Sequence, residues 1–248
     1  MKRFISCALA LLFVSGCFAQ TAQTVETTQA VETVDTQHSA TEKSEWLQSF
    51  SAVHIEAPIE VTFVRIPDNE APKIVYDTKG SYTTKFRFEV KNRVLRINER
   101  ADSRRPGQTK VTIYYNVLDA LSITYANATF REPITAKLFD LSIGAHASLT
   151  ATLDVKDLNM ELTSRGSAKV EGTVRYLTLY VSNGTVDGLG LETMAARVNV
   201  TSGGSVTLDV TERMEATTST SGTINYKTEP PIVRGGMRFM GGSIEQAQ

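Results

Sequence analysis

Short runs of alternating apolar and polar residues fill the chain from residue 46 to residue 245. In one run Leu121 and Ile123 alternate with polar neighbours, and in another Leu177, Leu179 and Val181 do the same. Alternation with a period of two predicts strands that turn one face toward a core and the other toward solvent. No stretch between these runs combines helical length with a 3.6-residue period, so the pattern predicts an all-β protein.

A five-residue pattern recurs after these runs: a small residue, any residue, Ala or Gly, Ser or Thr, and an apolar residue. Its six copies are spaced 19, 19, 18, 20 and 18 residues apart, and they begin at Ala126, Ala145, Ser164, Ser182, Ser202 and Thr220. A near-constant period of this size is typical of a solenoid. Because such a repeat is too short for a βαβ unit, we expect a parallel β-helix with coils about 4.8 Å apart and about 19 residues long. The side chains predicted to stack in one interior column are Leu141, Met160, Leu179 and Val198.

The small residues of the pattern are expected at the corners of the coils. Ala and Gly let stacked corners approach without a side-chain clash, and Gly also permits positive φ. The neighbouring Ser or Thr can bond to the local backbone or to its equivalent on the next coil. This structural role accounts for the Ser/Thr ladder better than a polar binding track does.

The region from Trp46 to Asn116 alternates in the same way but has no regular period. We interpret it as the opening coils of the same solenoid, with insertions, of which residues 100–110 form the longest polar loop. At the other end, a strand over 237–240 flanked by glycines is expected to cap the stack, since terminal repeats must hide an open end.

The chain begins with the features of an export signal. Lys2 and Arg3 precede an apolar stretch over 4–14 that is too short to span a bilayer. Residues 14–17 resemble a bacterial lipobox in which Cys17 is lipidated and becomes the first mature residue. An ordinary signal peptidase site after Ala19 is the alternative. We therefore predict a signal peptide over 1–19, a disordered Thr-, Gln- and Glu-rich linker over 20–45 and a single β-helix domain over 46–248.

Composition narrows the choice of partners. The two cysteines, Cys7 and Cys17, both lie in the leader, so the mature domain has no disulfide. The formal net charge is −1, and loss of the leader removes only the bases Lys2 and Arg3. Without a basic face, nucleic acid is not an expected partner.

The leader, the polar linker, the Phe-x-x-Val-x-Ile entry at 50–55 and the Ser-x-Gly-Ser/Thr corners together resemble a known family. It is the head GIN domain family of putative auto-transporter adhesins, DUF2807, which is common in envelope lipoproteins of Bacteroidetes. The resemblance covers residues 46–245 and is best at the corners over 164–167, 182–185, 202–205 and 221–223. The first two corners, with Ala in place of Ser and Gly, depart from it. It implies a right-handed β-helix and an envelope location, and it brings no functional residues with it.

Candidate chemistry is sparse. The histidines His38, His54 and His146 share no metal-ligand spacing, and we expect neither a metal site nor a cofactor. The acids considered for a polysaccharide lyase or hydrolase are Asp154, Asp157 and Glu161. Two of them flank a lysine in a predicted turn, where Asp is common for backbone reasons. No nucleophile elbow, phosphate loop or Cys–His pair is present, so we predict no catalytic residues and no enzyme.

Outward aromatic side chains on stacked strands suit a sugar- or protein-binding face. The candidate binding face consists of Tyr114, Tyr125, Tyr176, Tyr180 and Tyr226. We therefore predict a non-enzymatic, adhesin-like binding module of the cell envelope whose partner is a glycan or an envelope protein. A structural or assembly spacer is the alternative, and a β-helix lyase or hydrolase the second. The predicted location is the outer membrane, by a lipid anchor, facing the periplasm or the surface; a soluble periplasmic or secreted protein is the alternative.

Overall fold

The computed structural model describes residues 42–78, 85–100 and 107–247, and its strands join into one 17-stranded arrangement without a helix. These residues belong to one compact unit, His38–Gln248. The N-terminal strands are β1 (Glu42–Trp46), β2 (Ala52–Glu56), β3 (Ile59–Arg65), β4 (Lys73–Asp77), β5 (Phe86–Lys91), β6 (Val94–Glu99), β7 (Thr109–Tyr115), β8 (Ala120–Thr124) and β9 (Asn127–Phe130). The remaining strands are β10 (Ile134–Gly144), β11 (Ser148–Thr163), β12 (Ser167–Ser182), β13 (Thr185–Thr201), β14 (Ser205–Ser219), β15 (Thr223–Tyr226), β16 (Ile232–Phe239) and β17 (Ser243–Gln246).

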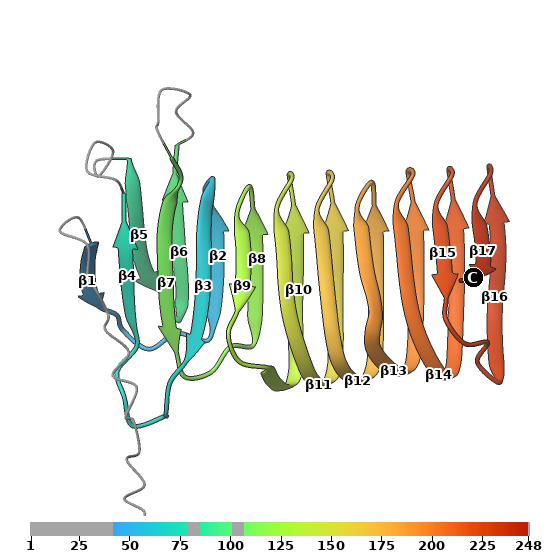
Figure 1. Cartoon of the computed structure of the whole chain (residues 1–248), viewed down its shortest axis with the longest axis horizontal. Helices are drawn as coiled ribbons and strands as arrows, with labels where there is room; N and C mark the ends of the chain where they lie inside the picture. The colour runs from blue at the N-terminus through green and yellow to red at the C-terminus, as the bar shows by residue number, and fades with distance from the viewer. Residues whose placement is uncertain (1–41, 79–84, 101–106, 248) are drawn as a thin grey trace, which may run out of the picture. The chain divides into compact units, whose positions relative to one another are not determined.

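The strands form a parallel β-solenoid with two stacked sheets (Figure 1). Each coil runs up one sheet, turns at a corner and returns down the other. The parallel strands of the pre-corner sheet are β6, β2, β8, the later parts of β10 to β14, and β16. The parallel strands of the post-corner sheet are β7, β3, β9, the earlier parts of β11 to β14, β15 and β17. The β-helix predicted from the alternation and from the recurrence of about 19 residues is confirmed.

The interior is built from columns of aliphatic side chains, one from each coil. The predicted column is confirmed, because the ladder pairs Leu141 with Met160, Met160 with Leu179, and Leu179 with Val198. All four side chains are buried, as alternation requires. Apolar burial at every rung is the main source of stability, since each coil covers its inner face only with its neighbours.

Corners of the later coils are tight turns with left-handed backbone at two successive residues, except the corner at 182–185, where only Asn183 has a positive φ. At one corner Ala145 and His146 have φ of 41° and 63°, and the Ala147 amide donates to the Gly144 carbonyl at 2.9 Å. Positive φ at both central residues with this hydrogen bond is the pattern of a type I′ turn. Gly203 and Gly241 adopt positive φ at two corners, whereas elsewhere Ala, Ser, Thr, Arg, Asn or His adopts it.

From the corner at Ser164 onward, close stacking favours glycine at the third corner position. A Cβ on Gly166 would lie 2.7 Å from the Ile143 carbonyl oxygen, and one on Gly184 would lie 2.9 Å from the Gly166 carbonyl oxygen. The predicted close approach of stacked corners is thus confirmed. The fourth position bonds along the stack, as the Ser243 and Thr223 hydroxyls do at 3.4 Å.

The first and last corners differ from the predicted spacing. Leu149 pairs with Ala128, so after the corner Ala126 takes the position of Ala147 and not that of Ala145. This slip of two residues keeps the inward and outward alternation. Before the corner Gly144 pairs with Thr124, so the first corner is one residue shorter than the next. A seventh corner begins at Met240, and β17 continues beyond it. The expected capping strand over 237–240 is therefore half of one more coil.

The region over 46–116 is not a plain run of opening coils. The coil made by β2 and β3 lies between the β6–β7 coil and the β8–β9 coil, so the order of stacking differs from the order of the chain. Three strands run antiparallel to their partners: β5 beside β6, β4 beside β7, and β1 beside β4. The prediction of parallel rungs offset by about 19 residues is wrong here, because non-local pairing cannot be read from a local period.

The predicted linker and leader lie mostly outside the described residues. Within them, residues 42–45 of the proposed 20–45 linker form β1, where the Tyr76 hydroxyl donates to the Glu45 carboxylate at 2.7 Å. The predicted signal peptide and Cys17 fall outside the described part of the chain. Where the structure is described, no helix has the length and apolar character to cross a membrane.

Candidate functional site

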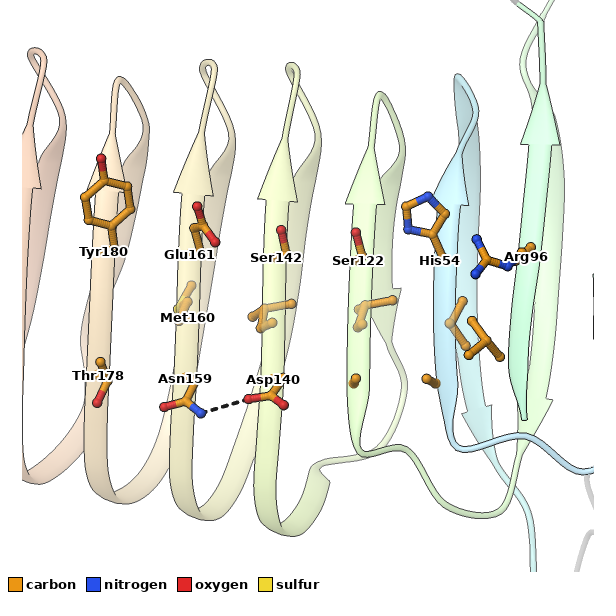
Figure 2. Close-up of a pocket in the computed structure, with 16 residues that line it drawn as sticks. His54, Arg96, Ser122, Asp140, Ser142, Asn159, Met160, Glu161, Thr178 and Tyr180 are labelled. Carbon is orange, nitrogen blue, oxygen red and sulfur yellow. Dashed lines mark hydrogen bonds between the residues drawn. The ribbon is translucent and has the colours of Figure 1, made fainter. Parts of the chain in front are cut away.

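A hollow of about 530 Å³ crosses the outer face of the pre-corner sheet (Figure 2). It extends over six adjacent strands in the order β6, β2, β8, β10, β11 and β12. Five strand spacings of about 4.8 Å give it a length of roughly 24 Å along the solenoid axis. We call this feature the pre-corner hollow.

Small side chains form the floor of the pre-corner hollow. Ala52 pairs with Ala120, and Ser122 pairs with Ser142, on the three central strands β2, β8 and β10. Each of these side chains projects outward because it alternates with a buried aliphatic residue. These short side chains leave a depression between the longer side chains of the hollow, two of which, His54 and Asp140, project from β2 and β10 themselves.

The two walls of the hollow differ in charge. Arg96 and His54 are ladder partners on β6 and β2, and the Arg96 guanidinium reaches toward the His54 ring (Figure 2). At the other side lie Asn159, Glu161 and Tyr180, whose strands follow in register. The hollow is thus cationic toward the N-terminal half, and acidic, amidic and aromatic toward the C-terminal half.

Among the described residues, the side-chain hydrogen bond within the hollow lies at its acidic wall. The Asn159 amide donates to the Asp140 carboxylate at 2.8 Å, a bond between successive coils. Among the described residues, neither Arg96 nor His54 has a side-chain hydrogen bond or ion pair, and Glu89, the ladder partner of Arg96 on β5, forms no ion pair with it. Arg197, further along the same sheet, instead pairs with Glu215 at 3.1 Å. The cationic wall therefore offers donors that the fold does not consume.

The five candidate tyrosines do not share one face. Tyr176 and Tyr180 lie on the outer face of the pre-corner sheet and are 41% and 40% exposed. Tyr125 lies at a corner with φ of 64°. Tyr114 and Tyr226 lie on the post-corner sheet, near its opposite ends. Of the five, Tyr180 alone lines the pre-corner hollow.

Two of these tyrosines also have structural roles. The Lys73 ammonium lies 4.5 Å from the centroid of the Tyr114 ring, a cation–π contact between ladder partners. Tyr226 packs against the hydrophobic core. These contacts leave Tyr176 and Tyr180 as the pair that faces solvent on one sheet.

The acids considered for catalysis are not brought together. Asp154 lines a separate hollow and accepts a hydrogen bond from Thr173 at 3.3 Å, whereas Glu161 lines the pre-corner hollow. Asp157 pairs with Lys156 at 3.7 Å. In the described ranges, no group of three His, Cys, Asp or Glu side chains is placed to hold a metal ion.

The contribution of Arg96, His54, Asp140 and Asn159 was missed by the sequence reasoning. They come from parts of the chain that are far apart, and β6 stacks beside β2 only because the N-terminal coils are out of order. The one available signal was the pairing of Asp140 and Asn159, which are 19 residues apart and fit the period.

The fold and the hollow define a β-solenoid protein with a solvent-open polar surface, and the comparisons agree with this class. The family model for "Putative auto-transporter adhesin, head GIN domain" (DUF2807) matches residues 49–230, and the chain belongs to this family. A search of curated proteins found no match.

Solved structures share the fold at low sequence identity. A putative adhesin from Bacteroides fragilis NCTC 9343 is 18% identical, with a TM-score of 0.76 over 83% of this chain and 96% of that one. A putative adhesin from Parabacteroides distasonis ATCC 8503 is 19% identical, with a TM-score of 0.61 over 84% and 96%. A putative lipid binding protein from the same strain is 17% identical, with a TM-score of 0.58 over 84% and 98%. At these identities the likeness shows the fold alone.

Proposed function

We propose that this chain is an exported, non-catalytic, adhesin-like binding protein of the cell envelope, and that the pre-corner hollow is its binding site for a glycan. One observation carries the proposal: the hollow joins unpaired donors, carboxylate and amide acceptors and an exposed aromatic ring in one open trough. Sugars present hydroxyl groups that bond to such side chains and an apolar ring face that packs on aromatic residues. The adhesin name of the family supports the class of function.

Anchoring belongs to the same proposal. Cys17 is lipidated and holds the mature protein to the outer membrane, on the periplasmic or the outer side, because two acyl chains give a stable anchor whereas one gives a marginal one. Mass spectrometry of the mature N-terminus tests this step. A first residue of lipid-modified Cys17 supports it, and a first residue of Gln20 favours the ordinary signal peptide.

The matched tyrosines of β12 test the binding site. Tyr180→Ala should weaken glycan binding about tenfold, in the range typical of one stacked aromatic residue. Tyr176→Ala is the control, because Tyr176 lies on the same strand and face with nearly the same exposure but outside the hollow. Calorimetric titration with glycans selected on an array measures both. Equal losses for the two variants, or no glycan binding at all, would contradict the proposal.

A structural or assembly role is the second candidate, and the last coil favours it. Ile232, Val233, Phe239 and Met240 are all exposed, with fractions between 46% and 69%. An uncovered apolar edge of this kind can stack on another subunit. A concentration-dependent mass in solution that is lost in Phe239→Ser would support this alternative.

A further inference from the structure

The charge pattern of the pre-corner hollow restricts the kind of glycan that it can hold, and this step rests on the function proposed above. Its cationic wall has the fork-shaped guanidinium of Arg96 and the imidazole of His54 side by side, both without a partner among the described residues. A guanidinium matches a carboxylate with two parallel N–H···O bonds. The wall is therefore suited to one carboxylate.

The opposite wall is unsuited to a second carboxylate. Asp140 and Glu161 project from β10 and β11 on the same outer face, so a ligand that is acidic at every sugar would meet like charges there. Neutral sugars instead donate hydroxyl hydrogens to these carboxylates. The Tyr180 ring, on the next strand, offers a packing surface for the apolar face of an uncharged sugar.

The length and direction of the hollow fit an extended chain. It follows the solenoid axis across six strands, and one pyranose ring with its linkage is close in length to the strand spacing of about 4.8 Å. Successive sugars of a chain lying along the axis would then meet successive coils. Both walls would be reached by one oligosaccharide of about five or six sugars, given a span of roughly 24 Å.

We propose that the pre-corner hollow binds a glycan in which acidic sugars are separated by neutral or N-acetylated ones, with one uronate-type carboxylate held by Arg96 and His54 and the neutral part lying over Asp140, Glu161 and Tyr180. The ligand class is thus a mixed acidic glycan, distinct from a neutral polymer and from a homopolymer of uronates.

The test uses hexasaccharides of known charge pattern. The probes are alternating uronate and N-acetylhexosamine chains with α and β linkages, uronate homopolymers, and the carboxyl-reduced form of each, all titrated into the purified full-length mature protein. At least one alternating chain should bind at least tenfold more tightly than its carboxyl-reduced form and than the homopolymers.

Variants assign that difference to the cationic wall. In Arg96→Gln the tenfold preference for the acidic form over the reduced form should disappear, and Arg96→Lys should keep part of it. Arg197→Gln is the control, because Arg197 lies on the same sheet outside the hollow and is paired with Glu215. That variant should keep the whole preference. Thermal unfolding of each variant checks that the exposed substitutions leave the fold intact.

The results separate this inference from the proposed function. If reduced and acidic forms bind equally in a Tyr180-dependent manner, or Arg96→Gln weakens both forms alike, the mixed acidic class is wrong while the glycan-binding function stands. If homopolymers bind as tightly as alternating chains, the acidic wall does not exclude them and the inference is again wrong. If no glycan of any charge binds, both fall.

Discussion

The two halves of the solenoid stack their coils by different rules. From β10 onward each coil lies directly after the one before it in the sequence, and neighbouring coils are 18 to 20 residues apart at their corners. Between β2 and β9 the first coil of the chain lies between the second and the third, and antiparallel strands flank the second coil. In the second half, coils that stack in chain order form a uniform face. In the first half, coils that stack out of chain order bring side chains from unrelated segments together.

The pre-corner hollow lies where these halves meet. Three of its strands, β6, β2 and β8, belong to the N-terminal half, and the other three, β10, β11 and β12, belong to the sequential half. The cationic wall comes from the first group, and the acidic and aromatic wall from the second. The difference between the halves therefore shapes the chemistry of the site.

Removing one coil from each half should produce the largest contrast. Deletion of residues 185–204 joins Gly184 to Ser205, which are in corner register, and leaves every strand of the hollow in place. We expect a folded protein whose melting temperature falls by less than about 10 °C, since repeat stabilities are roughly additive. Deletion of residues 51–66 removes the coil on which both neighbours stack, and it should abolish cooperative unfolding. Thermal unfolding followed by circular dichroism measures both, and similar melting curves would refute the contrast.

A smaller effect separates the reasons for glycine at the corners of the sequential half. A Cβ on Gly222 would lie 2.5 Å from the Val200 carbonyl oxygen, while one on Gly203 would have nothing within 4 Å but a φ of +74°. Gly222→Ala should lower the free energy of unfolding by about 2–3 kcal/mol through overpacking. Gly203→Ala should cost about 1 kcal/mol through left-handed backbone strain. Urea unfolding measures both variants. The earlier corners hold Ala126 and Ala147 at the position of Gly222, so a Cβ fits there. If Gly222→Ala cost no more than Gly203→Ala, the later corners would be no more tightly stacked than the earlier ones.

The smallest predicted effect is a loss of stability that begins only at alkaline pH, and it concerns two tyrosines of the N-terminal half. Burial raises the pKa of Tyr76 to about 12, with help from its hydrogen bond to Glu45, and burial raises the pKa of Tyr115 to about 12 as well. Because both folded-state pKa values exceed the unfolded value of about 10, the folded state binds more protons between these values. Stability is therefore complete below about pH 10 and falls as the pH rises toward about 12.

Absorbance of tyrosinate against pH checks this order of ionisation. Tyr76→Phe and Tyr115→Phe should each remove one late-titrating group, and the double variant should resist alkaline unfolding better than the parent. Tyr176→Phe, at an exposed site of the sequential half, is the control and should leave both late-titrating groups in place. Loss of an early group in the first two variants would show that these hydroxyls are exposed to water.

The sequence predicted those parts of the fold in which residues on adjacent coils are one repeat of about 19 residues apart along the chain. The column from Leu141 to Val198 follows from a period of 19, as does the crowding at the corner glycines. The same period could not place β2 between β6 and β8, because those pairings join unrelated segments. The left-handed corner residues were missed because Ala145, Ser164 and Arg165 adopt a backbone that their residue types disfavour in isolation.

The sequence predicted the type of residue at the candidate site but not most of the residues that form it. An exposed tyrosine on the solenoid face was expected, and Tyr180 lies in the hollow. Tyr176 shares the face of Tyr180 but lies outside the hollow. The other three candidate tyrosines scatter, because outward residues of different coils share a face only if their strands share a sheet and a register. Arg96 and His54 gave no local signal, since each is an ordinary polar residue of an alternating strand.

The stacking of the first coil between the second and the third also constrains the order in which the coils can fold. The β2–β3 coil is synthesised before both of its stacking neighbours, which end at residues 115 and 130. Long-range pairing of this kind is slow, because chain closure precedes the contacts that reward it. The hollow can then be complete once residue 182 is available, before the last coils emerge. The hollow thus needs none of the coils that follow residue 182, and those coils lengthen the solenoid beyond it.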